Sequence, residues 1–300
     1  MAGPMNQANF SYFVQKDLSE HFGAGWGDFE SMIPALFTRK TPDQAIVYEV
    51  LVGDLGTVPV FDGEVSYDDS KQSYRKSTEE VEYAYGIKTT KKLRRNDLYG
   101  IVQDQARLLG GRFRAVGESI AAGIFNGAFG TTTTADTLSL CNSAHTSDQT
   151  DGANQSNTGT SAFSPSIVES MRRNMIKFKS NRNNILPDSF PDLLLGPTEL
   201  EEKFFEINKS GKQVGTALNN ANWHEGKWKT ATWHNWLSDT DNFFLINSKQ
   251  MKRFLKFYEW NTTEFFFAGE VDTLVTKHVG YRSFNVSAAD WRWVFGQNPA

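Results

Sequence analysis

Apolar residues recur at steps of three and four from about residue 94 to residue 129, and this period predicts one long amphipathic helix. Some 30 residues at ~1.5 Å each give a rod of roughly 45 Å, about three times the length of an average globular helix. Asn96 is expected as its N-cap, and Arg107, Arg114 and Glu118 are expected on the face opposite the apolar stripe. The predicted stripe consists of Leu98, Ile101, Val102, Leu109, Phe113, Val116, Ile120 and Ile124.

Five glycines lie within this stretch, and each costs ~1 kcal/mol relative to alanine inside a helix. A helix that accepts this cost is expected to need either close backbone approach or a bend. Taken alone, the stretch is also typical of the central core helix of an α/β enzyme. The five are Gly100, Gly110, Gly111, Gly117 and Gly123.

Extended chain is predicted before this helix. Residues 44–61 predict a strand, a turn at residues 53–56 and a second extended piece, whereas residues 62–90 are polar. Together they predict a long two-stranded ribbon that turns around residues 68–73. Because such a ribbon has little core of its own, it is expected to lie on a partner subunit, and a solvated surface hairpin is the alternative. The late part of the run alternates apolar and polar sites at Val81, Tyr83, Tyr85 and Ile87.

Residues 1–43 combine a short predicted helix over residues 10–22 with glycine-rich irregular chain. Scattered aromatic residues favour an N-terminal arm lying on another surface, and their composition equally supports a segment docked on its own core. The aromatic residues concerned are Phe10, Phe13, Phe22, Trp26 and Phe29.

The chain that follows the long helix begins with a loop rich in Ser, Thr, Asn and Gly at residues 130–166. Ser164 and Pro165 then mark the start of a second helix. The apolar face expected for it comprises Ile167, Val168, Met171, Met175 and Phe178.

Short elements are predicted further on, beginning with a buried strand at Leu193–Leu195. Thr198 and Glu201 predict a capping box for a short helix with Leu200, Phe204 and Ile207 on one face. The remaining predictions are a tryptophan-rich loop at residues 209–242, a strand at residues 243–247, helical turns at residues 251–258 and β structure to residue 296.

Composition narrows the class of protein. The 300 residues are 39% hydrophobic and 22% charged, so a packed core is expected and global disorder is excluded. The net charge of −4 lacks the basic excess of a sequence-independent nucleic-acid binder. The single cysteine, Cys141, allows no internal disulfide and fits a reducing cytoplasm. Neither a signal peptide nor an apolar run of ~20 residues is recognisable, so no membrane span is expected.

Chemistry-bearing patterns are weak, and no catalytic, cofactor or metal site is expected. His224 and His234 flank a tryptophan cluster, but their spacing matches no zinc motif and no carboxylate pair completes a triad. His145 lies in the polar loop beside Ser143, where a catalytic role is not expected. The tryptophan cluster could stack on sugars, although packing in a core or interface is favoured.

The order of these segments resembles one known family. Residues 80–127 (EVEYAYGIKTTKKLRRNDLYG…) resemble a run from an extended loop through a switch into a spine helix. Residues 190–207 (FPDLLLGPTELEEKFFEI) resemble the strand, turn and helix of an axial domain, and residues 289–296 (ADWRWVFG) resemble a terminal peripheral strand. Over about residues 40–296 the layout is similar to the major capsid proteins of tailed bacteriophages, closest to Mu-like head subunits.

The resemblance implies an α+β, HK97-like capsid fold, because the family is held together by the order of its parts. The implied parts are an N-terminal arm (1–43), a first peripheral segment (44–56), an extended β-hairpin loop (57–92), the peripheral domain with the spine helix (93–186), the axial domain (187–261) and the C-terminal peripheral strands (262–300). Bending of the spine helix between shell states would then account for its glycines.

The resemblance also implies a structural protein without enzymatic activity. It would form homo-oligomeric pentamers and hexamers of an icosahedral virion shell around double-stranded DNA, without sequence-specific binding and without a membrane. Assembly would occur in the bacterial host cytoplasm with scaffold, portal and possibly decoration proteins. An encapsulin-type compartment shell is one alternative, and a carbohydrate-active enzyme that uses the tryptophan loop is another.

Two contact regions are hypothesised on this basis. Residues 62–82 carry seven acids and three bases, whereas residues 91–118 carry seven bases and three acids, so an acidic loop is expected to dock on the basic helix start of the next subunit. The alternative is that these charges only solvate the loop and cap the helix. The predicted subunit contacts are Asp68, Asp69, Glu79, Glu80 and Glu82 with Lys91, Lys92, Arg94 and Arg95, and the predicted capsomer hub is Trp223, Trp228, Trp233 and Trp236.

Overall fold

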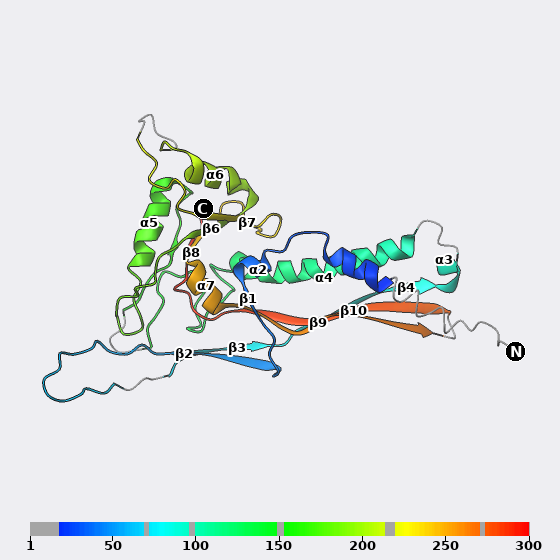
Figure 1. Ribbon diagram of the computed structural model, residues 1–300, viewed down its shortest axis with the longest axis horizontal. Coiled ribbons are helices and arrows are strands. Elements are labelled where there is room, and N and C mark those ends of the chain that lie inside the picture. Colours follow the sequence, from blue (N-terminus) through cyan, green and yellow to red (C-terminus); the bar gives the residue numbers. More distant parts are fainter. Residues whose placement is uncertain are drawn as a thin grey trace.

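The protein is described here by a computed structural model, which covers residues 18–68, 72–95, 100–148, 153–213, 220–270 and 274–299. A long sheet and a long helix form one part, a second sheet with two helices forms another, and a two-stranded ribbon ends in a long loop (Figure 1). The predicted α+β composition is thus confirmed.

The long sheet has four strands in the order β1-β9-β10-β4. The central β9 and β10 form an antiparallel hairpin, β4 pairs antiparallel with β10, and β1 lies parallel to β9. Helix α4 runs along this sheet (Figure 1) and contacts β10 and β4. The elements are β1 (Thr38–Lys40), β4 (Glu82–Thr90), α4 (Ile101–Asn126), β9 (Leu255–Glu270) and β10 (Val275–Ala288).

The second sheet has five short strands in the order β5-β11-β8-β6-β7. Strands β6, β8 and β11 are buried throughout, which explains their nearly continuous apolar sequences. Helix α5 packs on β8 and β11, and helix α6 packs on the edge strand β7. The elements are β5 (Thr158–Gly159), α5 (Pro165–Ile176), β6 (Leu193–Gly196), η1 (Thr198–Leu200), α6 (Glu201–Lys209), β7 (Lys229–Thr232), β8 (Phe243–Ile246) and β11 (Val294–Gln297).

The ribbon consists of β2 and β3, which pair antiparallel. The prediction of a ribbon is confirmed, but its turn was expected around residues 68–73, whereas Asp68 lies at the base of a long loop that joins Val52 to Gln72. The alternating strand at Val81–Ile87 does not belong to the ribbon, because that strand is β4 and pairs with β10 in the long sheet. The remaining elements are α2 (Ile33–Leu36), β2 (Ile46–Val52), β3 (Gln72–Glu79), α3 (Lys91–Arg95) and α7 (Ser248–Phe254).

The long helix is confirmed, although it begins later than predicted. Helix α4 starts at Ile101 after Gly100, whose φ of 70° is favourable only for glycine, and residues 91–95 form the separate helix α3. The predicted cap Asn96 and Leu98 lie outside the described residues. Of the predicted apolar stripe, Val102, Leu109, Phe113 and Ile124 are buried as expected, whereas Ile101 and Val116 are exposed. The buried face also includes Ala106, Gly117, Ala121 and Phe125.

Glu118 was expected on the solvent face, and this prediction is wrong. The residue is 1% exposed, and its carboxylate accepts hydrogen bonds from the Ser31 hydroxyl, from the Met32 backbone N–H at 3.3 Å and from Trp233 Nε1 at 3.1 Å. Helical periodicity predicts the buried and exposed faces of a helix from the residues of that helix only. The three donors come from elsewhere in the chain, so periodicity could not predict that Glu118 is buried. Glu118 therefore joins the N-terminal segment and the tryptophan loop to the spine helix.

Close backbone approach, one of the two roles predicted for the glycines, is confirmed at Gly110. A Cβ atom there would lie 2.0 Å from the carbonyl oxygen of Phe22, and a Cβ at Gly25 would lie 1.8 Å from the carbonyl oxygen of Arg107. A helix at residues 18–26 therefore packs directly on α4 through reciprocal glycine contacts. The predicted helix at residues 10–22 overlaps this helix only in part, and Phe10 and Phe13 lie outside the described residues.

Several predictions in the second half are confirmed. Helix α5 starts at Pro165, where the Ser164 hydroxyl accepts a hydrogen bond from Ile167 N at 3.3 Å. Strands β6 and β8 lie where buried strands were expected, and Phe204 and Ile207 are the buried face of α6.

Other predictions in this half are wrong. The Thr198 hydroxyl does not cap α6, because it lies 3.2 Å from His234 Nδ1 and a 3-10 turn precedes the helix. Strand β7 lies within the segment predicted as loop, and residues 255–258 begin β9 instead of continuing the helical turns.

Candidate assembly interface

The loop between β2 and β3 exposes an unusual concentration of apolar side chains. All residues from Leu55 to Asp68 are exposed, and the loop extends beyond the body of the molecule (Figure 1). A solvated hairpin would carry polar residues here, because contiguous exposed apolar surface normally marks an interaction site. Six large apolar residues of this segment are exposed, namely Leu55 (55%), Val58 (89%), Val60 (94%), Phe61 (71%), Val65 (64%) and Tyr67 (93%), and Val52 at the end of β2 is 72% exposed.

The base of this loop is held by the turn that follows α5. Asn184 Nδ2 donates to Asp54 Oδ2 at 3.0 Å and to the Leu55 carbonyl at 2.8 Å. On the returning side, Asp68 forms an ion pair with Arg182 and accepts from the Gly56 backbone N–H. Both ends of the loop are therefore fixed to the same turn, and residues 57–67 project from a defined base.

The predicted acidic contacts do not gather on the projecting part. Asp68 is paired within its own chain, Glu82 accepts a hydrogen bond from the Tyr281 hydroxyl at 2.6 Å, and Glu79 ends β3 beside the long sheet. Glu80 is half-buried just after β3, and Asp69 lies outside the described residues. Besides Asp68 at its base, the acids that the loop exposes are Asp62 and Glu64.

The predicted basic contacts lie far from the loop. Lys91 and Lys92 are exposed on α3, and α3 lies at the opposite end of the long axis from the tip of the loop (Figure 1). The side chains of Arg94 and Arg95 are outside the described residues. One chain therefore cannot bring its own predicted acids and bases together.

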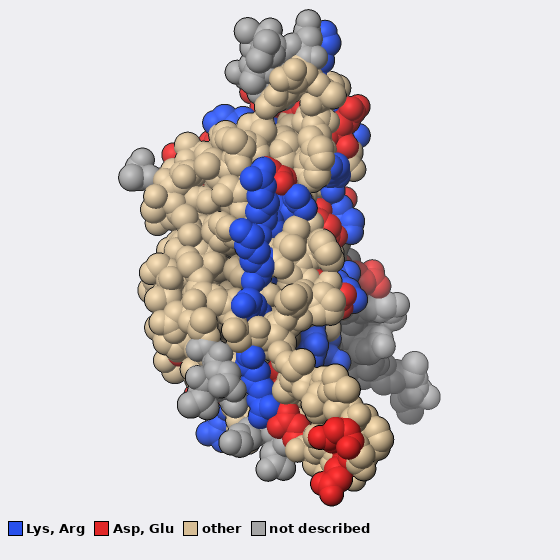
Figure 2. Space-filling view, turned by 90° about the vertical axis from the view of Figure 1, so that its left-hand side faces the viewer, with Lys and Arg blue, Asp and Glu red and all other residues tan. Residues whose placement is uncertain are grey.

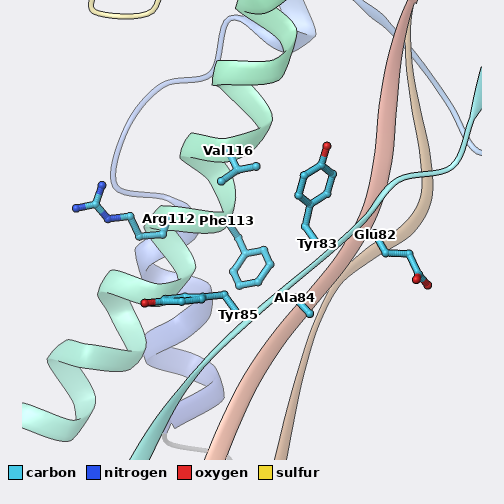
Figure 3. A pocket seen from close by; sticks show the side chains of 7 residues that line it. All are labelled: Glu82, Tyr83, Ala84, Tyr85, Arg112, Phe113 and Val116. Carbon is cyan, nitrogen blue, oxygen red and sulfur yellow. The ribbon is translucent and has the colours of Figure 1, made fainter.

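An apolar cleft opens between α4 and β4. It encloses about 350 Å³ and is lined by side chains from both elements (Figure 3). The rings of Tyr83 and Phe113 form its inner wall, Tyr85 is 68% exposed at its edge, and the Arg112 side chain lies on its α4 side (Figure 3). Within the described chain, Arg112 has no hydrogen bond or ion pair. The full lining is Glu82, Tyr83, Ala84, Tyr85, Arg112, Phe113 and Val116.

Sequence patterns did not indicate the loop or the cleft as apolar sites. Val58, Val60 and Phe61 were assigned to a second extended piece of the ribbon, although Pro59 lies among them and disfavours a paired strand. That proline, with Gly56 and Gly63 on either side, is the signal that could have identified an unpaired loop. The cleft has no such signal, because it arises from two elements that meet only in the folded chain.

The predicted tryptophan hub is divided between core and surface. Trp228 is 5% exposed and donates to His224 Nδ1 at 3.2 Å, and Trp233 is 2% exposed and bonded to Glu118. Neither side chain can contact another subunit directly. Trp236 is half-buried, and Trp223 is 51% exposed, so the hub hypothesis is left with Trp223 as its main member.

The histidines considered for chemistry have structural surroundings. His145 is buried, stacks on Trp291 with ring centroids 4.2 Å apart, and lies 2.7 Å from Asp136 and 3.1 Å from Asn157. Burial works to raise the pKa of Asp136, but hydrogen bonds from His145 and Thr134 outweigh it and lower that pKa. Burial lowers the pKa of His224. No group of three His, Cys, Asp or Glu residues in the described part of the chain could hold a metal ion.

The sequence matches the family model of phage capsid proteins over residues 75–296, which is well over half of the chain. The chain belongs to the phage capsid protein family. Among curated proteins, none matches this sequence. None of the described helices is long and apolar enough to cross a membrane.

Solved structures share the fold of this phage capsid protein. The capsid of a native GTA particle has a TM-score of 0.61 at 9% identity, covering 91% of this chain and 91% of that chain. The capsid of Ralstonia phage GP4 has a TM-score of 0.60 at 12% identity, covering 87% and 86%. A virus-like particle from Pyrococcus furiosus has a TM-score of 0.53 at 9% identity, covering 95% and 99%.

These matches confirm the predicted HK97-like fold and the predicted family of tailed-phage capsid proteins. The protein is a structural subunit of the phage head, a major capsid protein of the virion. The specific likeness to Mu-like head subunits stays a prediction.

Proposed function

We propose that this capsid protein closes an icosahedral shell around double-stranded DNA by inserting its β2–β3 loop into the α4–β4 cleft of the neighbouring subunit. The observation that carries this proposal is the loop, whose apolar side chains are exposed by 55–94% between Leu55 and Tyr67. Similar chains form the capsids of Ralstonia phage GP4 and of a GTA particle, which supports repeated contacts between copies.

The geometry supports a head-to-tail contact. The loop projects from one end of the subunit, while the cleft lies along α4 on the long sheet (Figure 1), so a chain cannot fill its own cleft. A contact between two different surfaces of identical subunits is heterologous, and such contacts close into rings when the rotation fits. The ring sizes proposed here, pentamers and hexamers, are those that the family layout implies.

The chemistry of the loop tip matches that of the cleft. Phe61 offers an apolar ring to the wall of Tyr83 and Phe113, and the neighbouring Asp62 would reach the free guanidinium of Arg112. Burying a Phe side chain contributes about 1.5–3 kcal/mol, whereas an exposed ion pair contributes about 0–1 kcal/mol. The apolar contact therefore supplies most of the affinity between subunits, and the charges set the register of the loop in the cleft. This proposal replaces the purely ionic docking that was expected from the sequence.

The other parts of the proposal follow the family layout. The five-stranded sheet with α5 and α6 serves as the axial domain, and the long sheet with α4 serves as the peripheral domain. This proposal moves β5, α5 and β11, which the resemblance assigned to the peripheral segments 93–186 and 262–300, into the axial domain. Assembly takes place in the bacterial host cytoplasm with scaffold and portal proteins and, in some shells, decoration proteins. The acidic net charge of −4 is consistent with a shell that encloses DNA without binding it tightly. No catalytic step is assigned to the protein.

The two alternatives are less well supported. An encapsulin-type compartment would have the same fold, but the family match is to phage capsid proteins. A carbohydrate-active enzyme would need exposed aromatic platforms, and the faces of Trp228 and Trp233 are buried in the core.

Substitution at Phe61 tests the proposed contact. Phe61→Ser should raise the subunit concentration needed for shell formation by about tenfold or more, since 1.4 kcal/mol per contact corresponds to tenfold. The melting temperature of the unassembled subunit should not change, because Phe61 is 71% exposed. Phe61→Leu is the matched control that keeps an apolar side chain, and it should retain assembly, measured by size-exclusion chromatography and electron microscopy. Normal shells from Phe61→Ser at wild-type concentrations would refute the docking.

A further inference from the structure

Helix α5 presents bases to solvent on one side of the five-stranded sheet. The Arg173 side chain is 66% exposed and Lys177 is exposed one turn later. Glu169 accepts from Arg172 at 2.8 Å and from Arg173 at 3.0 Å, and the hydrogen bond from Arg172 is the main cause that lowers the pKa of Glu169 to about 2. The Glu169 carboxylate thus orients the guanidinium groups of Arg172 and Arg173. Because it carries one negative charge against their two positive charges, the surface stays positive.

An aromatic side chain lies at the same place. Trp223 is 51% exposed, the guanidinium of Arg172 lies 4.8 Å from its ring centroid, and the Lys227 ammonium contacts the same ring. A column of Lys and Arg side chains runs down this side of the molecule, with few acids beside it over most of its length (Figure 2). The basic face is defined here as Arg172, Arg173, Lys177, Trp223 and Lys227.

Helix α6 and the turn before it present the opposite charge. Phe204 and Ile207 anchor the helix in the core. Its outer surface carries Phe205, which is 64% exposed, and the exposed Glu201, Glu202 and Glu206, with Lys203 and Lys209 as the exposed bases. Glu199 in the turn before the helix makes four exposed acids against two bases, so this surface has a net negative charge. Among the described residues these acids have no hydrogen bond or ion pair. The acidic face is defined here as Glu199, Glu201, Glu202, Phe205 and Glu206.

The helices that carry the two faces pack on different strands of one sheet. Helix α5 packs on β8 and β11, and α6 packs on the edge strand β7, which is separated from β8 by β6. In Figure 1, α5 forms the left margin of this part and α6 lies at its top, toward the other side. The two helices thus lie on different sides of this part of the subunit. The segment that carries Trp223 and Lys227 also contacts the end of α6, where Gly226 N donates to the Asn208 carbonyl at 2.8 Å.

We propose that the basic face of one subunit binds the acidic face of the next around each pentamer and hexamer, so the partner is a second copy of this chain. The inference rests on the proposed shell function and identifies a second contact besides the loop. Charge complementarity fixes partner and register, while Trp223 and Phe205 supply the apolar area. Both rings are exposed in the subunit and would be covered in a closed ring.

Engineered cysteines test the pairing in the full chain, since the native Cys141 is buried and burial raises the pKa of its thiol, which makes it unreactive. Arg173 or Lys177 is replaced by Cys together with Glu202→Cys or Glu206→Cys, giving four double variants treated with a short bis-maleimide. The expected result is a covalent ladder that ends at five and six subunits. Arg173→Cys with Glu30→Cys is the mismatched control and should give no ladder. Failure of all four pairs in shells that form normally would overturn the pairing.

Charge exchange provides a second test. Lys177→Glu and Glu206→Lys should each raise the concentration needed for assembly by about three- to tenfold, because like charges then oppose each other. The combined variant should recover assembly to near the wild-type concentration. The two side chains are exposed, so the melting temperature of each unassembled subunit should match that of the wild type.

The outcomes separate this inference from the proposed function. If the wild-type chain forms no shells, the proposed function fails; if shells form and neither single variant changes their assembly, only the α5–α6 pairing fails. A Lys177→Glu shell that assembles normally but retains less DNA would overturn the pairing and assign the basic face to nucleic acid.

Discussion

Replacing Glu118 by alanine should lower the free energy of unfolding of the subunit by about 3–5 kcal/mol, because one buried and two part-buried donors lose their acceptor, and each such loss costs about 1–3 kcal/mol. The donors are the Ser31 hydroxyl, the Met32 backbone N–H and the Trp233 indole N–H. These groups come from the N-terminal segment and from the tryptophan loop, so the substitution should loosen both from α4 together.

The measurement is denaturant unfolding of the unassembled subunit, with tryptophan fluorescence as one probe because Trp233 contacts the substituted site directly. Glu118→Gln keeps one acceptor oxygen and should fall between the wild type and Glu118→Ala. Asp104→Ala is the matched control, since this acid lies in the first turn of the same helix and is exposed, where its loss costs about 0.3–1 kcal/mol. A change below 1 kcal/mol for Glu118→Ala would show that these donors find other partners.

The same residue shows what periodicity can and cannot predict. The helix itself was identified because its apolar residues repeat locally, and local repetition is a property of sequence. The burial of Glu118 depends on donors 86, 87 and 115 positions away, which no local pattern reports. His145 is similar, because its partners Asp136 and Asn157 lie in a loop that sequence composition describes only as polar.

The contact surfaces were predicted in kind but not in detail. A projecting ribbon that needs a partner could be inferred from its lack of a core. The acids expected to form its contact include Glu82, which the fold instead bonds to Tyr281, and Asp68, which it pairs with Arg182. Which side chains are exposed defines the loop, the cleft and the faces of α5 and α6. That exposure depends on tertiary packing, so it could not be predicted from the local sequence. The apolar pattern within each helix correctly predicted which sides of α5 and α6 are buried. It did not indicate that their exposed sides carry opposite charges that could form a contact.

Replacing Gly110 by alanine should lower the free energy of unfolding by about 2–3 kcal/mol, although alanine is the better helix former. The added methyl group would lie 2.0 Å from the carbonyl oxygen of Phe22, which is backbone and has no room to turn away. The helix at residues 18–26 must then shift, and Phe22, whose ring stacks on Phe265 at 4.9 Å, loses its packing. Limited proteolysis should cut the chain near this helix faster than in the wild type.

Gly123→Ala is the matched control because it is the same substitution in the same helix, and nothing lies within 4 Å of the added Cβ. It should raise the free energy of unfolding by up to ~1 kcal/mol through helix propensity alone. The pair also tests whether glycines permit α4 to bend between shell states, since close packing does not explain Gly123. A Gly123→Ala subunit that is more stable than the wild type but forms shells that cannot mature would assign bending to this position. Equal losses of stability at Gly110 and Gly123 would contradict the close approach, because only Gly110 faces the backbone of the N-terminal helix.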